Sequence, residues 1–283
     1  MLDSHYKDVI KYFSEKAAKY DLVDQQLYWR LSDELLKKIV KVKLVKPFQG
    51  RKELRILDAG AGTGRWSLFL HDLLKNTLKL HFDLVDITEK MLIEADKKIE
   101  KKRLTNIMKT YLGNIENLSN YSNSYYDVAI SFYNVLSFTE KPDFALREIF
   151  KKLKKRGLYA SIVSNKYHSY FFAILTKRIE ELAEIRGGKT KYTKEMPQIH
   201  CFTPDEIKEL YHKNGFKKVE VIGFPNFVYP NIEDTKIEGQ SGQNKNILEN
   251  KRTFQKILDI EFRECFNRDV VGRGNTLLVI GEK

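Results

Sequence analysis

The sequence predicts an α/β protein with a doubly wound, mostly parallel sheet of seven strands and helices on both faces. Two patterns lead to this fold class. Short apolar segments alternate with longer segments of helical periodicity, which is typical of βαβ units. The first apolar segment runs directly into a glycine-rich turn, LDAGAGTG, and such turns let the backbone come close to a ligand.

The segment before the sheet is expected to be helical. Apolar residues recur at helical spacing over residues 5–20 and again over residues 24–42. We therefore expect residues 1–45 to form an N-terminal helical cap.

Residues 46–163 are expected to form a cofactor-binding core that holds five of the seven strands. The strands are predicted at residues 54–59, 80–86, 107–112, 126–132 and 158–163. The helices between them are predicted at residues 66–73, 91–102 and 144–155. Ligands bind such sheets at the carboxyl ends of the strands, so the loops that follow the strands are the expected site.

The regular alternation stops after residue 163. Residues 164–200 combine a helical segment over 170–185, a Gly187-Gly188 turn and a basic polar loop, and we expect them to form a lid beside the acceptor. The aromatic residues of 167–172 either wall an apolar acceptor pocket or form the core of this lid.

Residues 201–283 are expected to complete the sheet. Thr203, Pro204, Glu206 and Gly215 predict a helix with an N-cap, a proline at its first position, a capping box and a C-cap. The remaining elements are a strand at 219–222, a mobile surface loop near 231–250, a helix at 252–266 and a strand at 276–280.

The charge balance leaves two interpretations open. The 283 residues include 50 Lys and Arg against 38 Asp and Glu, a formal net charge of +12. An anionic partner such as nucleic acid would explain this excess, and so would a lysine-rich surface. Most basic groups fall on outer faces or ends of predicted helices, and only residues 186–194 border the expected acceptor site.

Several classes of protein are excluded by composition and motifs. No apolar stretch suits a transmembrane span or a signal peptide. The two cysteines, Cys201 and Cys265, exclude a disulfide framework and a cysteine-based zinc site, although one disulfide between them stays open. The histidines lack metal-ligand spacing. We expect a cytoplasmic protein, monomer or homodimer, with no metal and no membrane partner.

The glycine loop distinguishes three ligand classes. A phosphate-binding loop has the pattern GxxxxGK[ST]. Counted from Gly60, Arg65 stands in place of its second glycine and Trp66 in place of its lysine. A dinucleotide loop needs a small residue where Arg65 stands. The third pattern, GxGxG, fits Gly60, Gly62 and Gly64.

On this loop and three further segments, the chain resembles class I S-adenosylmethionine-dependent methyltransferases over about residues 45–165. The segments are Asp86 at the end of the second strand, GNIENL at 113–118 and DVAISFYNVLSF at 127–138. The resemblance implies S-adenosylmethionine as cofactor and S-adenosylhomocysteine as product.

The resemblance also implies roles for individual residues. Asp86 accepts hydrogen bonds from the ribose hydroxyls, Ile87 and Met91 flank the adenine, and Asn114 replaces an acid that binds the adenine amino group. Arg30 and Tyr20 are expected near the methionine end. The other expected cofactor contacts are Asp58, Gly60, Ala61, Gly62, Thr63, Gly64, Ile115, Glu116, Ser131, Phe132 and Tyr133.

Methyl transfer needs mainly an acceptor atom held in line with the reactive carbon, and a base only where the acceptor must lose a proton. The candidates for catalytic roles are His200, which ends the insertion before the capped helix, Tyr133 and Tyr20. His168, which follows the fifth strand, is weighed in the same way as His200. For both histidines a structural hydrogen bond is the alternative.

Methyl transfer to O or N of a small molecule is the function the sequence favours. Its alternatives are an RNA methyltransferase of the tRNA wobble-uridine type, a cofactor-binding protein without turnover, and a dinucleotide-dependent oxidoreductase.

Overall fold

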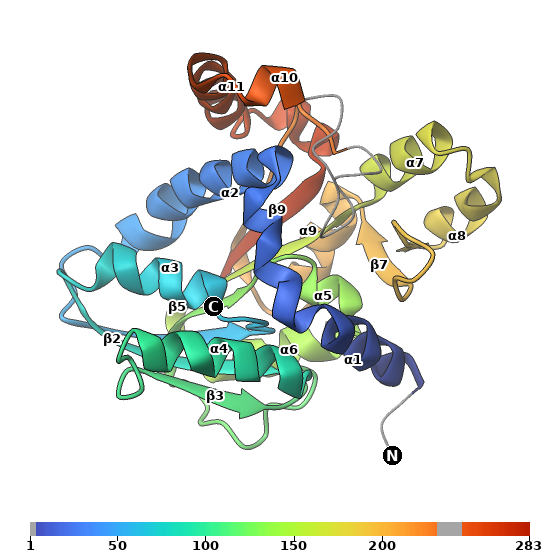
Figure 1. The fold of residues 1–283 in the computed structure, drawn as a ribbon. Coiled ribbons are helices and arrows are strands. Elements are labelled where there is room, and N and C mark those ends of the chain that lie inside the picture. The colour runs from blue at the N-terminus through green and yellow to red at the C-terminus, as the bar shows by residue number, and fades with distance from the viewer. Residues whose placement is uncertain (1–3, 231–244) are drawn as a thin grey trace.

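The computed structural model describes residues 4–230 and 245–283. Seven strands form the predicted doubly wound sheet in the order β3-β2-β1-β4-β5-β9-β8 (Figure 1). Neighbours from β3 to β5 are parallel, whereas β9 is antiparallel to both β5 and β8. Their bounds are β1 (Glu53–Ala59), β2 (Lys79–Asp86), β3 (Met108–Leu112), β4 (Tyr126–Ser131), β5 (Leu153–Asn165), β8 (Lys217–Phe224) and β9 (Thr276–Glu282).

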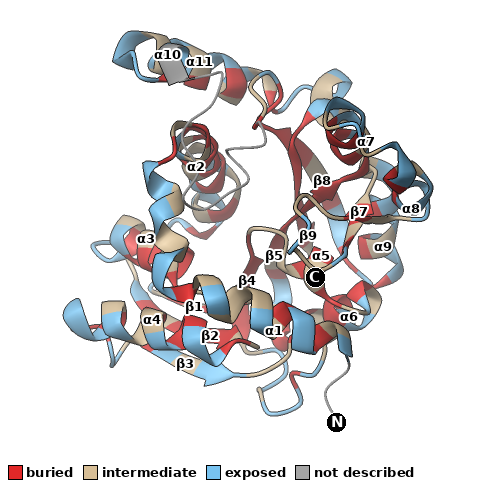
Figure 2. Ribbon diagram, turned by 45° about the vertical axis from the view of Figure 1, so that its right-hand side comes forward, coloured by how far each residue is buried: buried red, intermediate tan, exposed pale blue. Residues whose placement is uncertain are grey.

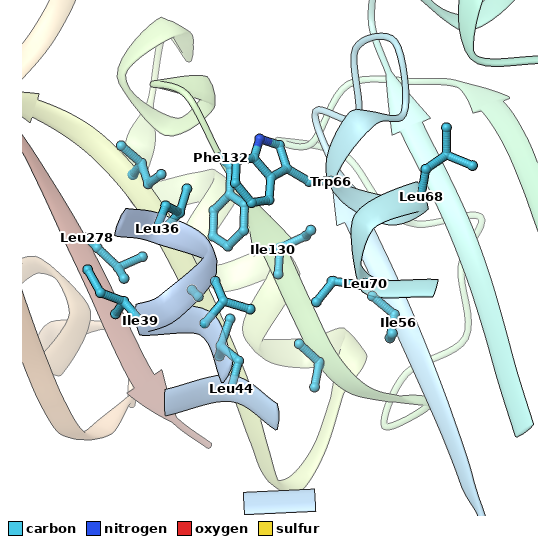
Figure 3. Close-up of a cluster of buried hydrophobic side chains, with 14 of the residues drawn as sticks. Leu36, Ile39, Leu44, Ile56, Trp66, Leu68, Leu70, Ile130, Phe132 and Leu278 are labelled. Carbon is cyan, nitrogen blue, oxygen red and sulfur yellow. The ribbon is translucent and has the colours of Figure 1, made fainter. Parts of the chain in front are cut away.

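The central strands are buried on both faces because their apolar residues point alternately to two cores. Ile56 of β1 belongs to one core and Leu57 to the other. Figure 3 shows the first core, with Leu36 and Ile39 beside Leu278 of β9. It packs under α2 (Leu27–Val40), α3 (Arg65–Leu74), α4 (Glu89–Lys101) and α11 (Lys251–Glu264).

The opposite face of the sheet carries the second core. It is covered by α6 (Pro142–Lys152), α9 (Pro204–Lys213) and the short α5 (Val135–Phe138). Figure 2 shows this layering as buried strands between helices whose outer sides are exposed. Within the described ranges, no helix is both long and apolar enough to cross a bilayer.

The N-terminal cap differs from the two predicted helices. The first α-helix, α1 (Ser4–Lys16), ends before residue 20 and continues as the 3-10 turns of η1 (Ala17–Gln25). Side chains of η1 bind the glycine loop, and these contacts outweigh helical propensity. After α2 the chain passes through η2 (Lys41–Val45) and η3 (Lys46–Phe48) into the sheet.

The structure differs from the predicted lid, residues 164–200, in two places. The helical segment is split into α7 (Lys166–Leu175), η4 (Ile179–Glu181) and α8 (Leu182–Arg186), because the chain turns at Lys177, whose φ is 59°. The basic polar loop begins and ends in a hairpin of β6 (Lys189–Thr190) and β7 (Ile199–Phe202), and β7 joins the carboxyl end of β5.

The C-terminal part follows the sequence prediction closely. Thr203 and Glu206 form the predicted capping box, and Gly215 follows the helix with a φ of 92°. Residues 231–244 of the predicted loop lie outside the described residues, and its end forms α10 (Lys245–Leu248) instead of a loop. Before β9 the chain makes the turns of η6 (Arg268–Arg273).

Candidate active site

A cavity lies at the carboxyl edge of the sheet, where the sequence predicts the cofactor. It holds about 880 Å³ of atom-free space, its open mouth included. Residues expected to hold the cofactor line it: Asp58, Gly60, Ala61, Gly62, Thr63, Asp86, Ile87, Met91, Asn114, Ile115, Phe132, Tyr133 and Tyr20.

The glycines of the loop have different tasks. Gly60 has a φ of 91°, and a Cβ atom there would lie 2.2 Å from Cγ1 of Val135. Gly62 has a φ of 53°, and no atom lies within 4 Å of the place of its Cβ. Gly64 does not line the cavity; its Cβ position is 3.3 Å from Ala95 and Leu84. Gly60 and Gly64 therefore allow close packing, and Gly62 leaves space in the cavity.

Asp86 connects the loop to β2. One carboxylate oxygen accepts a hydrogen bond from the Gly62 N–H at 2.8 Å, and the other accepts one from the Thr88 N–H at 2.8 Å. Burial raises the pKa of the Asp86 carboxyl. On β1, Asp58 accepts a hydrogen bond from the Ser67 hydroxyl at 2.7 Å, and burial raises its pKa to about 7.

The loop after β3 forms the other end of the cavity. The Asn114 side-chain oxygen accepts a hydrogen bond from the Glu116 N–H at 2.9 Å, which folds residues 114–116 into a tight turn. Glu116 points away from the cavity lining and accepts a hydrogen bond from the Lys141 N–H at 2.7 Å. Ser131 is also off the lining, since its hydroxyl donates to the Ala59 carbonyl at 2.6 Å and joins β4 to β1.

The N-terminal cap closes over this cavity. Tyr6, Val9 and Phe13 of α1 line it. The Thr63 hydroxyl donates to Asp21 of η1 at 2.6 Å, and Lys98 donates to the same carboxylate at 2.6 Å. The cap and the glycine loop are thus joined by side chains.

Arg65 connects the cap to the start of α3, directly after the glycine loop. Its guanidinium donates to Asp24 and to Asp33, and its side chain is 15% exposed. Burial raises the pKa of the Asp33 carboxyl to about 6.

Arg30, which the sequence places near the methionine end, is exposed and lies over the Phe254 ring outside the cavity. The predicted place of Arg30 is wrong, because this residue lies on the outer face of α2, which points away from the glycine loop. Arg65 is the arginine that lines the cavity.

A second cavity, of about 1080 Å³ including its open mouth, adjoins the first. Both cavities are lined by Phe13, Tyr20, Arg65, Tyr133 and Phe138. The second is further lined by aromatic rings, polar side chains and a few aliphatic ones, among them Tyr12, Trp29, His168, Phe172, Tyr192, Asn134 and Asn275.

Tyr133 and Asn134 stand where the two cavities meet. Both have positive φ angles, 61° and 66°, which are strained for residues other than glycine. Among the described residues, the Tyr133 hydroxyl and the Asn134 side-chain oxygen have no hydrogen-bond partner although they are buried. The same holds for the Trp66 indole N–H at the first cavity. Buried polar atoms of this kind are uncommon, and the three residues that carry them belong to the linings of the two cavities.

The two histidines occupy different surroundings. His200 lines neither cavity; its Nε2 lies 2.8 Å from Lys189 Nζ and 3.1 Å from the Glu140 carbonyl oxygen. Its predicted catalytic place is therefore wrong, because the β6–β7 hairpin holds it in a structural contact. His168 is buried in the wall of the second cavity, and burial lowers its pKa to about 4, so it is neutral at pH 7.

Sequence reasoning missed cavity residues from the cap, from the starts of α3 and α4, and from the segment after β4. The apolar face of α1 was visible, but nothing local indicates where that face packs. The missed residues are Tyr6, Val9, Phe13, Arg65, Trp66, Thr88, Val135, Phe138 and Thr139.

Comparison with known proteins identifies the family of the chain. A family model described as a methyltransferase domain matches residues 51–218. A demethylmenaquinone methyltransferase of Leptospira interrogans is 28% identical over 234 residues, which cover 78% of this chain and 88% of the relative. A ubiquinone/menaquinone biosynthesis C-methyltransferase of Rickettsia bellii is 27% identical over 224 residues, covering 73% of this chain and 84% of the relative.

Two solved structures share the fold. An S-adenosylmethionine-dependent methyltransferase from Thermotoga maritima aligns with a TM-score of 0.55 at 18% identity, covering 97% of this chain and 99% of its own. A phosphoethanolamine N-methyltransferase of Haemonchus contortus in complex with S-adenosylmethionine gives 0.53 at 17% identity, covering 86% of this chain and 52% of its own.

Proposed function

This chain belongs to the methyltransferase-domain family, and we propose that it methylates a ring carbon of a small, apolar, quinol-type acceptor. It is a class I S-adenosylmethionine-dependent methyltransferase. The observation that carries the acceptor proposal is the pair of adjoining cavities, one beside the glycine loop and one walled by aromatic rings.

The first cavity fits the cofactor. Gly62 leaves an open cradle, and Asp86 at the end of β2 offers carboxylate oxygens to two hydroxyl groups. Ile87 and Met91 provide apolar walls for a flat base, with the Asn114 amide beside them. When bound, S-adenosylmethionine supplies a methyl group on a positively charged sulfur atom, ready for transfer to a nucleophile.

The residues shared by both cavities belong to the methyl-transfer region. Tyr133 and Tyr20 line both cavities, and the buried Tyr133 hydroxyl has no hydrogen-bond partner among the described residues. Their task in this proposal is to orient the acceptor and to exclude water, because alignment supplies much of the rate.

The second cavity suits a flat, apolar acceptor. Rings such as Phe172 and Trp29 give it walls on which another ring can stack. An aromatic carbon becomes nucleophilic when a hydroxyl on the ring gives up its proton. His168 is neutral and lines this cavity, so its free ring nitrogen can accept that proton.

The relatives favour carbon as the methylated atom, since their names describe quinone and C-methyltransferases. The O or N acceptor that the sequence favours stays a prediction within the same small-molecule class. A polynucleotide acceptor receives less support, because Lys16 and Arg65 are the cationic side chains among the described lining of the second cavity, and Arg65 is already paired.

The test is cofactor turnover with a defined acceptor. Purified protein is incubated with methyl-labelled S-adenosylmethionine and reduced naphthoquinone, with oxidised naphthoquinone as the matched control, and a bulk tRNA fraction in a third reaction. We expect S-adenosylhomocysteine and a carbon-methylated product with the reduced compound alone. A product labelled on a ring oxygen would show that the enzyme methylates oxygen rather than carbon. Turnover with tRNA only, or none at all with intact cofactor binding, would overturn the proposal.

A further inference from the structure

The second cavity has aromatic and polar walls but no acidic ones. None of the described residues that line it is Asp or Glu, and its two cations are Lys16 and Arg65. The charge of Arg65 is compensated, because its guanidinium donates to Asp24 and to Asp33, which lie outside this lining. His168 is neutral at pH 7, since burial lowers its pKa to about 4. The charge that remains in the lining is therefore that of Lys16.

Lys16 stands at the end of α1 without an anionic partner. Its ammonium nitrogen lies 4.4 Å from the centre of the Tyr12 ring, a cation–π contact that holds the charge in place without neutralising it. Within the part of the chain that the structure describes, this ammonium group forms no ion pair and no hydrogen bond. The residue is half-buried, and a cation that has lost part of its hydration favours a counter-ion.

The acids near this end of the cap do not supply that counter-ion. Burial raises the pKa of Tyr12, and the charge of Glu195 adds to the rise, so Glu195 acts on this end of the cavity from a distance. It is exposed, lies outside the lining and is not paired with Lys16. Glu15, the chain neighbour of Lys16, is likewise exposed and outside the lining. Asp21 already accepts hydrogen bonds from a threonine of the glycine loop and a lysine of α4.

The place of Lys16 assigns its counter-ion to the acceptor. Lys16 lines the second cavity and not the first, whereas Phe13, about one helical turn earlier on α1, lines both. A carboxylate of the cofactor, bound in the first cavity, is therefore the poorer match. A group bound by Lys16 lies beyond the residues that both cavities share, which belong to the methyl-transfer region.

We propose that Lys16 binds a carboxylate carried by the acceptor, so that the second cavity selects a hydroxylated aromatic ring with one acidic substituent away from the methylated carbon. This inference rests on the proposed function, because it concerns the acceptor of that reaction. The ring itself stays apolar and packs against aromatic walls, while the single cation fixes the orientation of its acidic end. One uncompensated cation suits one carboxylate, whereas a polynucleotide needs several.

The experiment compares two acceptors of the same size and different charge. Both are reduced naphthoquinones substituted on the ring that bears no hydroxyl, one with a carboxylate and the other with a neutral carboxamide. Anaerobic isothermal titration calorimetry measures the binding of each to protein saturated with S-adenosylhomocysteine, and turnover with S-adenosylmethionine is measured separately. The variants are Lys16→Met, which removes the charge, and Lys16→Arg, which keeps it. The matched control is Lys11→Met, because Lys11 is exposed on the same helix and lines neither cavity.

We expect the wild type, Lys16→Arg and Lys11→Met to bind the carboxylate about tenfold more tightly than the carboxamide, as a hydrogen bond between charged groups supplies. Lys16→Met should bind both compounds equally and keep the wild-type affinity for S-adenosylhomocysteine. Equal binding of both compounds by the wild type would overturn the proposal, and so would Lys16→Met that still prefers the carboxylate. If that variant keeps the preference but binds S-adenosylhomocysteine more weakly, the cation serves the cofactor instead.

The two measurements separate this inference from the proposed function. A preference for the carboxylate that depends on Lys16, without methylation of either compound, contradicts the proposed reaction alone. Methylation of both compounds with equal affinities contradicts the carboxylate site alone.

Discussion

The carboxylate of Asp86 accepts a hydrogen bond from the backbone N–H of Gly62 at 2.8 Å. The acid at the end of β2 therefore holds the glycine loop in place, in addition to facing the cavity where the ribose is expected. A second hydrogen bond, from the Thr88 N–H, fixes the start of α4 to the same side chain. Loop position and cofactor contact thus depend on one residue.

Asp86→Ala should weaken S-adenosylhomocysteine binding by about tenfold or more, because the hydrogen bonds to a charged acceptor are lost and two backbone donors lose their partner. Isothermal titration calorimetry measures the dissociation constant. Asp96→Ala is the matched control, since Asp96 accepts a hydrogen bond from Thr110 and does not line the cavity. An unchanged constant for Asp86→Ala would contradict the ribose assignment.

Two alanine substitutions in the loop should have opposite effects on folding and binding. Gly60→Ala places a Cβ 2.2 Å from Val135 and should destabilise the fold strongly. Gly62→Ala meets no atom within 4 Å and should cost about 1 kcal/mol from its left-handed backbone, while its methyl group fills the cofactor cradle. Urea unfolding and calorimetry separate the two effects. Gly62→Ala with wild-type cofactor affinity would show that the loop does not cradle the ligand.

Much of this site could be predicted because it is encoded locally. Gly60, Gly62, Asp86 and Asn114 lie on strand ends or on the turns that follow them, and Met91 lies in the first turn of the helix after β2. A parallel sheet brings these strand ends to one edge. The alternation of strands and helices predicted the sheet for the same reason.

The rest depends on how distant segments pack. Arg65 could be read only as the residue that breaks a dinucleotide loop, because its partners Asp24 and Asp33 belong to the cap. His168 and His200 look alike in sequence, yet α7 turns one toward a cavity and the β6–β7 hairpin holds the other away. Short elements such as α5 are below the length at which periodicity is readable.

Arg65→Met should reduce the free energy of unfolding by roughly 3 kcal/mol at neutral pH, because the buried Asp33 carboxylate loses its cation. Adding Asp33→Asn should recover much of this loss, since the unpaired charge is then gone. Urea unfolding of the single and double variants checks the coupling. Equal stability of Arg65→Met and wild type would contradict a structural role for this pair.

His168→Gln tests the proton acceptor of the proposed reaction. S-adenosylhomocysteine affinity should stay unchanged, since His168 lines only the second cavity. Turnover of reduced naphthoquinone should fall by about a hundredfold, the lower range for loss of a general base. The matched control is His200→Gln, which alters a histidine outside both cavities and should keep turnover near that of wild type. Equal losses in both variants would assign the effect to stability rather than to chemistry.

The same substitution predicts a pH dependence of stability. Burial lowers the pKa of His168 to about 4 from its ordinary 6.5. Between these values the unfolded chain binds a proton that the folded chain does not, so acidification through this range should destabilise the wild type relative to His168→Gln, by up to about 3 kcal/mol. Burial raises the pKa of Asp58 to about 7 and of Asp33 to about 6. Protonation of these carboxyls stabilises the folded state on acidification. This effect is the same in both proteins, so it cancels when their free energies of unfolding are subtracted. Urea unfolding of both proteins from pH 7 to pH 4 measures that difference, and a constant value across the range would show that His168 is protonated in the folded state.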